Sequence, residues 1–129
     1  MARVLIIDDD PNILRNVAEI LEEEGHEVRE AGDGKSALEL VADGWPDLIV
    51  SDMYMPEMDG IELLIRLQTD HPGTPMVAMS GGGYMAKEEL LRNASMLGAV
   101  AVLEKPFTVE RLLDVVNQAL EKGVVDETS

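Results

Sequence analysis

The chain has 129 residues, 46% of them hydrophobic, and contains no cysteine. This length suits one compact domain, and the lack of cysteine excludes disulfides, thiolate metal sites and cysteine nucleophiles. The 26 acidic residues against 10 basic ones give a formal net charge of −16, which argues against direct nucleic-acid binding because such binding needs basic residues to neutralise phosphates. No apolar run approaches the roughly 20 residues that span a bilayer, and no signal-type segment opens the chain, so we expect a cytoplasmic protein without a membrane partner.

Hydrophobic periodicity predicts five units of strand followed by helix. The first strand covers about 3–7, and Asp10 and Pro11 then provide an N-cap and a first helical residue for a helix that ends at Gly25. A weak, polar strand over 27–31 is typical of a sheet edge. Asp33 is placed to cap the second helix, which ends before Gly44.

The second half of the chain continues the alternation. A third strand over 47–50 is apolar on both faces and is therefore expected in the centre of the sheet. The third helix carries Ile61, Leu64, Ile65 and Leu67, and a fourth strand covers 76–79. Leu90, Leu91, Ala94 and Leu97 predict a fourth helix, a fifth strand covers 100–103, and Thr108 is placed to cap a fifth helix. Residues 1–122 form the predicted domain, and residues 123–129 a short, polar, frayed tail.

Polar side chains follow the apolar strands. Asp8 and Asp9 follow the first strand and Asp52 the third, while Ser80 follows the fourth and Lys105 the fifth. Ligands of open α/β sheets bind outside the carboxyl ends of the strands. We therefore expect these five side chains to share one crevice.

The crowded carboxylates indicate a cation site. Mg²⁺ prefers oxygen ligands and leaves room for water and phosphate, and it draws charge from a phosphoryl group during transfer. Lys105 supplies a compact positive charge, while Ser80 and the amides of the glycine run 81–83 supply hydrogen-bond donors. An ionised aspartate is already a nucleophile and needs no general base. The competing interpretation of Asp8 and Asp9 is a group of acids at a helix start, but Asp10 alone could serve that purpose.

Four segments together resemble the receiver domains of two-component response regulators. They are Ile6 to Pro11, Ser51 to Gly60, Met79 to Gly81, and Glu104 to Phe107. The resemblance runs from Arg3 to about Lys122. It implies a flavodoxin-like fold, which is a doubly wound five-stranded parallel sheet of strand order 2-1-3-4-5 with five helices.

The same resemblance implies a function and a role for each residue. Asp52 would accept a phosphoryl group from a histidine kinase or a histidine phosphotransfer protein. Asp8, Asp9, Asp52 and the backbone carbonyl of Tyr54 would hold Mg²⁺. Ser80 would be the switch hydroxyl, and Lys105 the conserved-type lysine, joined to Pro106 by a cis peptide.

The chain would then be a phosphoacceptor that is not a turnover enzyme. Its output would pass through a protein-interaction surface on the fourth helix, fifth strand and fifth helix, to an unknown downstream protein or a phosphorylation-dependent dimer. Val102 departs from the family pattern, which often has there an aromatic residue that rotates inward on activation, so the chain lacks the ring of an aromatic-coupled switch. Ser80 replaces the commoner threonine.

Several alternatives remain open on sequence alone. The chain could be a phosphorelay intermediate, or a receiver fragment of a longer regulator with an output domain. An aspartate-nucleophile phosphatase would need an acid where Tyr54 stands, and a degenerate receiver would show a damaged site. The segment Gly32 to Ser36 imitates the end of a P-loop, but Arg29 occupies the position of the required first glycine, so nucleotide binding is not expected.

Overall fold

The computed structural model describes residues 2–53, 60–81, 92, 95–96 and 98–128. Strands and helices alternate along this part of the chain. The strands are β1 (Arg3–Ile7), β2 (Glu27–Ala31), β3 (Leu48–Asp52), β4 (Met76–Ser80) and β5 (Ala99–Glu104). The helices are α1 (Pro11–Glu23), α2 (Gly34–Val41), α3 (Gly60–Asp70) and α5 (Val109–Thr128). The residues that predict the fourth helix, Leu90, Leu91, Ala94 and Leu97, lie outside the described residues.

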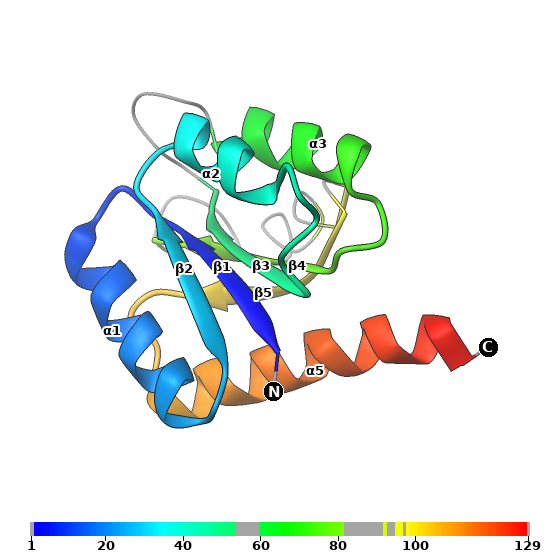
Figure 1. Ribbon diagram of the computed structural model, residues 1–129. Coiled ribbons are helices and arrows are strands. Elements are labelled where there is room, and N and C mark those ends of the chain that lie inside the picture. Colours follow the sequence, from blue (N-terminus) through cyan, green and yellow to red (C-terminus); the bar gives the residue numbers. More distant parts are fainter. Residues whose placement is uncertain (1, 54–59, 82–91, 93–94, 97, 129) are drawn as a thin grey trace.

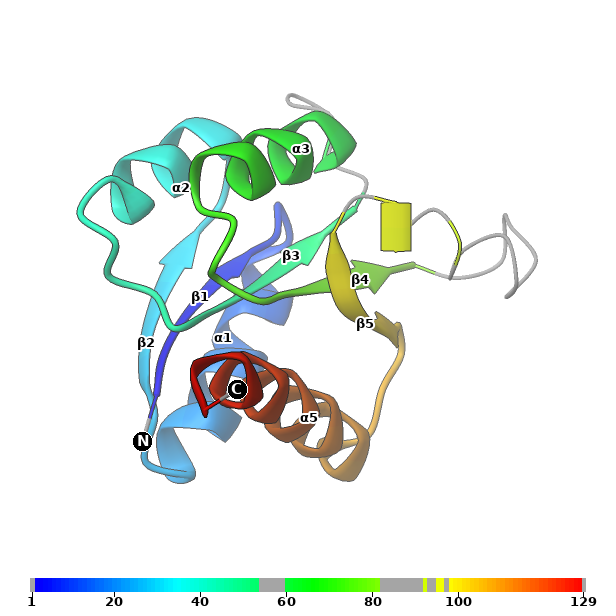
Figure 2. The ribbon, with the colours of Figure 1, turned by 90° about the vertical axis from the view of Figure 1, so that its right-hand side faces the viewer.

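The five strands form one parallel sheet of order β2-β1-β3-β4-β5, as expected. Helices α2 and α3 cover one face and α1 and α5 cover the other (Figures 1 and 2). Each face buries its own apolar cluster against these helices. Because all strands run in the same direction, their carboxyl ends meet at one edge of the sheet.

The helix starts follow the predicted capping chemistry. The Asp10 carboxylate accepts a hydrogen bond from the Asn12 amide at 2.9 Å, directly ahead of Pro11 in α1. Asp33 accepts from the Ser36 amide at 2.7 Å at the start of α2. Thr108 Oγ1 accepts from the Arg111 amide at 3.0 Å before α5. These side chains satisfy backbone donors that lack a partner within a helix.

Two element ends differ from the prediction. Strand β3 continues to Asp52 instead of ending at Val50, because Asp52 pairs with Met79 of β4 and the Met53 amide donates to the Met79 carbonyl at 3.0 Å. Helix α5 continues to Thr128, through most of the segment expected to be a frayed tail. Adding a turn to an existing helix is far easier than nucleating one, and the chain has no proline there.

Candidate functional site

The structure buries very few polar side chains, and they gather at one edge of the sheet. Among the described residues, the buried polar or charged ones are Asp8, Ser51, Asp52 and Ser80. Each lies at or directly beyond the carboxyl end of its strand. Burying a charged or polar group costs free energy unless it is paired, so this concentration of polar groups needs a functional explanation.

Asp8 is fully buried and both of its carboxylate oxygens are engaged. Its Oδ1 accepts a hydrogen bond from the Asp10 amide at 2.9 Å, and its Oδ2 lies 2.6 Å from Lys105 Nζ. The Asp8 amide donates to the Ala31 carbonyl of β2 at 3.1 Å, which fixes the backbone where β1 ends. The local turn and the lysine together hold this carboxylate in one orientation.

Lys105 bridges the carboxylates of Asp8, directly after β1, and of Asp52, the last residue of β3. Its ammonium lies 2.6 Å from Asp8 Oδ2 and 3.5 Å from Asp52 Oδ2, and its side chain is 18% exposed. The Lys105 amide donates to the Ser80 carbonyl at 2.7 Å, which extends the pairing of β4 with β5 up to the site. The peptide between Lys105 and Pro106 is cis, as the resemblance implied.

The two carboxylates also change the acidity of the lysine. Burial acts to lower the pKa of Lys105, but the hydrogen bond to Asp8 and the negative charges of Asp52 and Asp8 outweigh burial, and the pKa is raised above its ordinary value of 10.5. Lys105 is therefore a permanent cation near neutral pH. It can serve as counter-ion to the carboxylates or to a phosphate oxygen.

The acidic residues form a cluster suited to a divalent cation. Asp8, Asp9 and Asp52 each offer a carboxylate oxygen, and these three oxygens lie within 4.8 Å of one another. Asp8 and Asp52 are buried and Asp9 is exposed, so the cluster opens to solvent on one side. An all-oxygen set with an open side fits the requirements of Mg²⁺, which keeps several of its waters.

Ser80 lies at the end of β4 and is 5% exposed. It pairs in register with Glu104, so Ser80 and Lys105 lie on neighbouring strands beside the acidic cluster. Tyr54, whose carbonyl was predicted to bind Mg²⁺, lies outside the described residues, as do Gly82 and Gly83. The structure thus brings together Asp8, Asp9, Asp52 and Lys105, with Ser80 on the adjoining strand end.

Comparison with known protein families shows to which family this chain belongs. The profile of the response regulator receiver domain matches residues 4–117, which is most of the chain. This chain belongs to the receiver-domain family. Phosphorylation of an aspartate and use of Mg²⁺ are general features of this family, and the acidic cluster of this receiver domain could bind Mg²⁺ in the same way.

Relatives of this receiver domain come from regulators of different sizes. It is 40% identical over 120 residues to the nitrogen assimilation regulatory protein NtrX of Azorhizobium caulinodans, covering 92% of this chain and 26% of that protein. It is 31% identical over 118 residues to the sporulation initiation phosphotransferase F of Bacillus subtilis, covering 92% of this chain and 93% of that protein. The chain therefore spans about a quarter of the first relative and nearly all of the second.

A solved structure shows the same architecture. The CheY-like receiver domain protein of Methanospirillum hungatei has a TM-score of 0.87 and 30% identity to this chain, and 98% of each chain is covered. Within the described residues, no helix of this receiver domain combines the length and apolar character needed to cross a membrane.

Val102 occupies the position where the family often has an aromatic residue. In this receiver domain it is 8% exposed and belongs to the apolar cluster beneath α2 and α3, in register with Ala78 of β4. Its side chain is β-branched, which restricts χ1, and it has no ring to make the inward rotation that the resemblance attributes to an aromatic residue.

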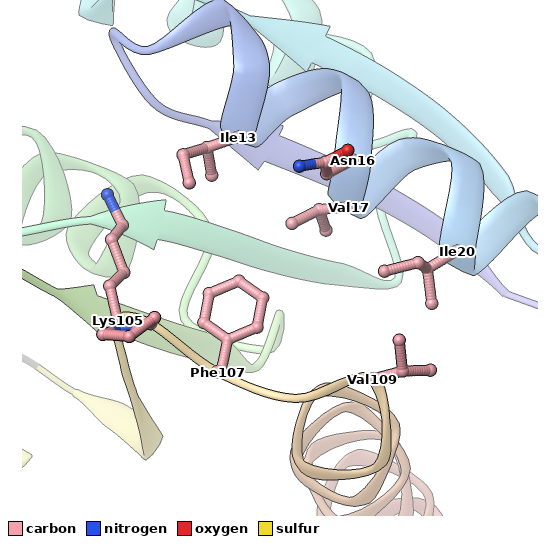
Figure 3. A pocket seen from close by; sticks show the side chains of 8 residues that line it. Ile13, Asn16, Val17, Ile20, Lys105, Phe107 and Val109 are labelled. Carbon is pink, nitrogen blue, oxygen red and sulfur yellow. The ribbon is translucent and has the colours of Figure 1, made fainter.

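A groove beside the site was not predicted from the sequence. It has a volume of about 240 Å³ and lies between α1 and the connection from β5 to α5 (Figure 3). Its lining residues are Ile13, Asn16, Val17, Ile20, Lys105, Pro106, Phe107 and Val109. Ile13 of α1 is only half-buried on this groove. The available signal was Phe107, the single phenylalanine of the chain, directly after Lys105 and Pro106.

Proposed function

We propose that this receiver domain accepts a phosphoryl group on Asp52 from a phosphohistidine of a histidine kinase or phosphotransfer protein. The observation that carries this proposal is the position of Asp52. Its carboxylate is buried at the carboxyl end of a central strand, beside a lysine and within an acidic cluster that can hold a cation. The typical place of action of the family is the cytoplasm, and we propose the same for this chain.

The transfer needs little from the protein except position and charge. A carboxylate oxygen of Asp52 forms a bond to phosphorus while the phosphorus–nitrogen bond of the phosphohistidine breaks and the imidazole leaves with the electron pair. The product is an acyl phosphate. Asp8 and Asp9 would hold Mg²⁺ together with Asp52, and the bound ion would supply neutralisation of the phosphoryl charge. Lys105, now between Asp8 and Asp52, is within reach of a phosphoryl oxygen on Asp52.

Phosphorylation would change the balance of charges around Lys105 and Ser80. A phosphoryl group carries up to about two negative charges at neutral pH and offers three acceptor oxygens. The ammonium of Lys105 and the hydroxyl of Ser80 would reorient toward these oxygens and bias the surface around β5 and α5 between two states. The downstream partner would be another protein or a second copy of this domain.

Two uses of the domain remain compatible with its relatives. The Bacillus subtilis relative is a phosphotransferase of nearly the same length, which favours a phosphorelay intermediate. The Azorhizobium caulinodans relative is a regulatory protein about four times as long, which favours the receiver part of a longer regulator. In both uses the chain would be a phosphoacceptor and not a turnover enzyme.

Incubation with acetyl phosphate and Mg²⁺ tests the proposal without a protein partner. Intact-mass measurement should show the addition of one phosphoryl group to the chain and none in Asp52→Asn. Removing Mg²⁺ with a chelator should also prevent the addition. An unmodified chain in the presence of Mg²⁺, or equal modification of Asp52→Asn, would refute phosphoacceptor function at this residue.

The groove supports a protein as the natural donor. It is walled by apolar side chains of α1, of the connection from β5 to α5 and of Val109, and its end at Lys105 lies beside the proposed phosphoacceptor. An exposed apolar surface next to a reactive centre favours a partner that covers it during transfer. Val109 is 48% exposed on this groove, and Ile65 of α3 is 52% exposed on the opposite face of the sheet.

These two residues give a matched pair of variants. Val109→Gln should slow phosphoryl transfer from a phosphorylated histidine phosphotransfer protein and leave the reaction with acetyl phosphate unchanged, because only the protein donor contacts the groove. Ile65→Gln should change neither reaction. Equal slowing by both variants, or an effect of Val109→Gln on acetyl phosphate alone, would exclude the groove as the donor-docking surface.

A further inference from the structure

Among the described residues, Ser51 is the one buried polar residue that has no role in the proposed phosphoryl transfer. It is 0% exposed and directly precedes Asp52 in β3. Side chains alternate between the faces of a strand, so Ser51 shares a face with Ile49 and Met53, which belong to the apolar cluster under α2 and α3. Its register neighbours Ile7 and Ala78 belong to the same cluster.

This location is unfavourable for a hydroxyl. Burying one in apolar surroundings costs free energy unless it is hydrogen-bonded. Alanine or valine would suit the layer formed by Ile7, Ile49, Met53 and Ala78. The hydrogen bond that Ser51 makes therefore identifies what the hydroxyl contributes.

Ser51 Oγ donates a hydrogen bond to the backbone carbonyl of Asp52 at 3.2 Å. The same peptide unit continues into the Met53 amide, which donates to the Met79 carbonyl of β4 at 3.0 Å. The peptide that leaves Asp52 is thus held at its carbonyl by Ser51 and at its amide by β4.

The pairing of β3 shows in which direction the Asp52 carbonyl points. In a parallel strand, alternate residues direct their amide and carbonyl groups to opposite neighbours. Ile49 and Met53 direct their amides at β4, so Asp52 directs its backbone groups toward β1. The pairing of β1 with β3 ends at Ile7 and Ser51, where β1 turns away into Asp8. The Ser51 hydroxyl donates to the Asp52 carbonyl at this end of the strand.

We propose that Ser51 is a positioning residue for Asp52. Its hydroxyl fixes the peptide plane that follows the phosphoacceptor, and this plane sets the direction of the Asp52 carboxylate relative to Lys105 and the acidic cluster. The consequence for phosphoryl transfer rests on the proposed function, whereas the fixed peptide plane does not. Ser51 itself touches neither phosphoryl donor nor cation.

Three variants separate the hydroxyl from the volume of the side chain. Ser51→Ala removes the hydroxyl without adding atoms, and Ser51→Thr retains it. Ser51→Val matches Ser51→Thr in shape, so any strain from the added methyl group is common to both. The maximum rate of phosphorylation is measured with acetyl phosphate at saturating Mg²⁺, together with the half-saturating acetyl phosphate concentration and the resistance to urea.

A hydrogen bond worth about 1 kcal/mol corresponds to roughly a fivefold change in rate. We expect Ser51→Ala and Ser51→Val to lower the maximum rate by about this factor, with the half-saturating concentration unchanged, and Ser51→Thr to retain the rate. A structural role alone would lower urea resistance and leave the maximum rate of the folded protein unchanged. Equal rates in Ser51→Thr and Ser51→Val would overturn the proposal.

A second measurement does not depend on phosphorylation. The ¹³C resonance of the Asp52 carbonyl and the ¹⁵N resonance of the Met53 amide should move in Ser51→Ala and stay close to their original positions in Ser51→Thr. If the unmodified chain accepts no phosphoryl group, the proposed function fails, and these resonances still decide whether Ser51 holds the peptide. Resonances that are unaffected by loss of the hydroxyl would overturn the proposal on their own.

Discussion

Lys105 is the residue on which the charge balance of the resting site depends. Its ammonium lies 2.6 Å from the fully buried carboxylate of Asp8 and 3.5 Å from that of Asp52. Removal of one partner from a buried ion pair leaves an uncompensated charge, which is more destabilising than the loss of the contact itself. A divalent cation bound to these carboxylates would therefore neutralise the same negative charges as Lys105 does.

Replacing Lys105 should expose this overlap. Lys105→Met is expected to lower the free energy of unfolding by about 3 kcal/mol without Mg²⁺, and added Mg²⁺ should restore part of the loss by taking over charge neutralisation. Urea unfolding with and without Mg²⁺ measures both effects. Lys35→Met, at an exposed lysine of α2, serves as the control and should change little. Equal losses in the two variants would contradict the role of Lys105.

Replacing Asp9 should change stability in the opposite direction to replacing Lys105, because Asp9 adds negative charge to an already crowded cluster. It is exposed, and its carboxylate oxygen lies within 4.8 Å of those of Asp8 and Asp52. Asp9→Asn should raise the free energy of unfolding without Mg²⁺ by about 1 kcal/mol, the repulsion between two charges at this distance in water-like surroundings. It should also weaken Mg²⁺ binding in a titration followed by NMR. Asp114→Asn, on the exposed side of α5, should alter neither quantity. Mg²⁺ affinity that is unaffected by Asp9→Asn would remove Asp9 from the ligand set.

At the scale of single elements, helix α2 depends on its cap. The Ser36 amide donates to Asp33 at 2.7 Å, and this hydrogen bond, with smaller help from the Ser36 side chain and the Lys35 charge, lowers the pKa of Asp33 below its ordinary value of 3.8. A carboxylate with a lowered native pKa contributes stability that is present above its unfolded pKa and lost as the pH falls through the native pKa.

Asp33→Ala should therefore be less stable than the unmodified chain at neutral pH, and the difference should shrink as the pH falls below 3.8. Thermal unfolding of both proteins from neutral pH to pH 3 provides the comparison. Asp114→Ala is the control, since Asp114 is an exposed acid within α5 and not at a helix start. A difference in stability that does not vary with pH would show that the charge of Asp33 has no part in capping.

The elements that were predicted well are those with local causes. Asp10 with Pro11, Asp33 and Thr108 carry their capping chemistry in a few adjacent residues, and the strands of the sheet are short apolar runs. The ends of β3 and α5 were predicted less well. The end of β3 depends on its pairing with β4, which is distant in sequence, and α5 simply continues because nothing local stops it.

The site shows the same division between local and distant causes. The convergence of Asp8, Asp9, Asp52 and Lys105 could be predicted, because the carboxyl ends of parallel strands share one edge. The role of Ser51 could not, since its burial and its hydrogen bond to the Asp52 carbonyl depend on where β1 turns away from β3. Predicting the groove would likewise require the relative placement of α1 and the β5–α5 connection, which no local sequence pattern provides.

At the scale of the whole molecule, the formal net charge of −16 on 129 residues opposes compactness. At physiological ionic strength, salt largely screens the repulsion between exposed charges that lie more than about 8 to 10 Å apart, and this distance becomes shorter as salt is added. Raising the sodium chloride concentration at constant pH should therefore increase the melting temperature, and Mg²⁺ should increase it further by binding the acidic cluster. In Asp52→Asn, the sodium chloride effect should persist while the additional Mg²⁺ effect becomes smaller. A melting temperature that falls with moderate salt would mean that ion pairs, and not net repulsion, dominate the surface.

The central claim is that the carboxylate of Asp52, and no neighbouring group, receives the phosphoryl group. Treatment with acetyl phosphate and Mg²⁺, followed by borohydride reduction and peptide mapping, tests this directly, because borohydride reduces an acyl phosphate to an alcohol and leaves a serine phosphate intact. We predict homoserine in place of Asp52, dependent on Mg²⁺ and on acetyl phosphate. An unreduced Asp52 in a phosphorylated chain, or a phosphoryl group that remains on Ser51 or Ser80, would contradict the account.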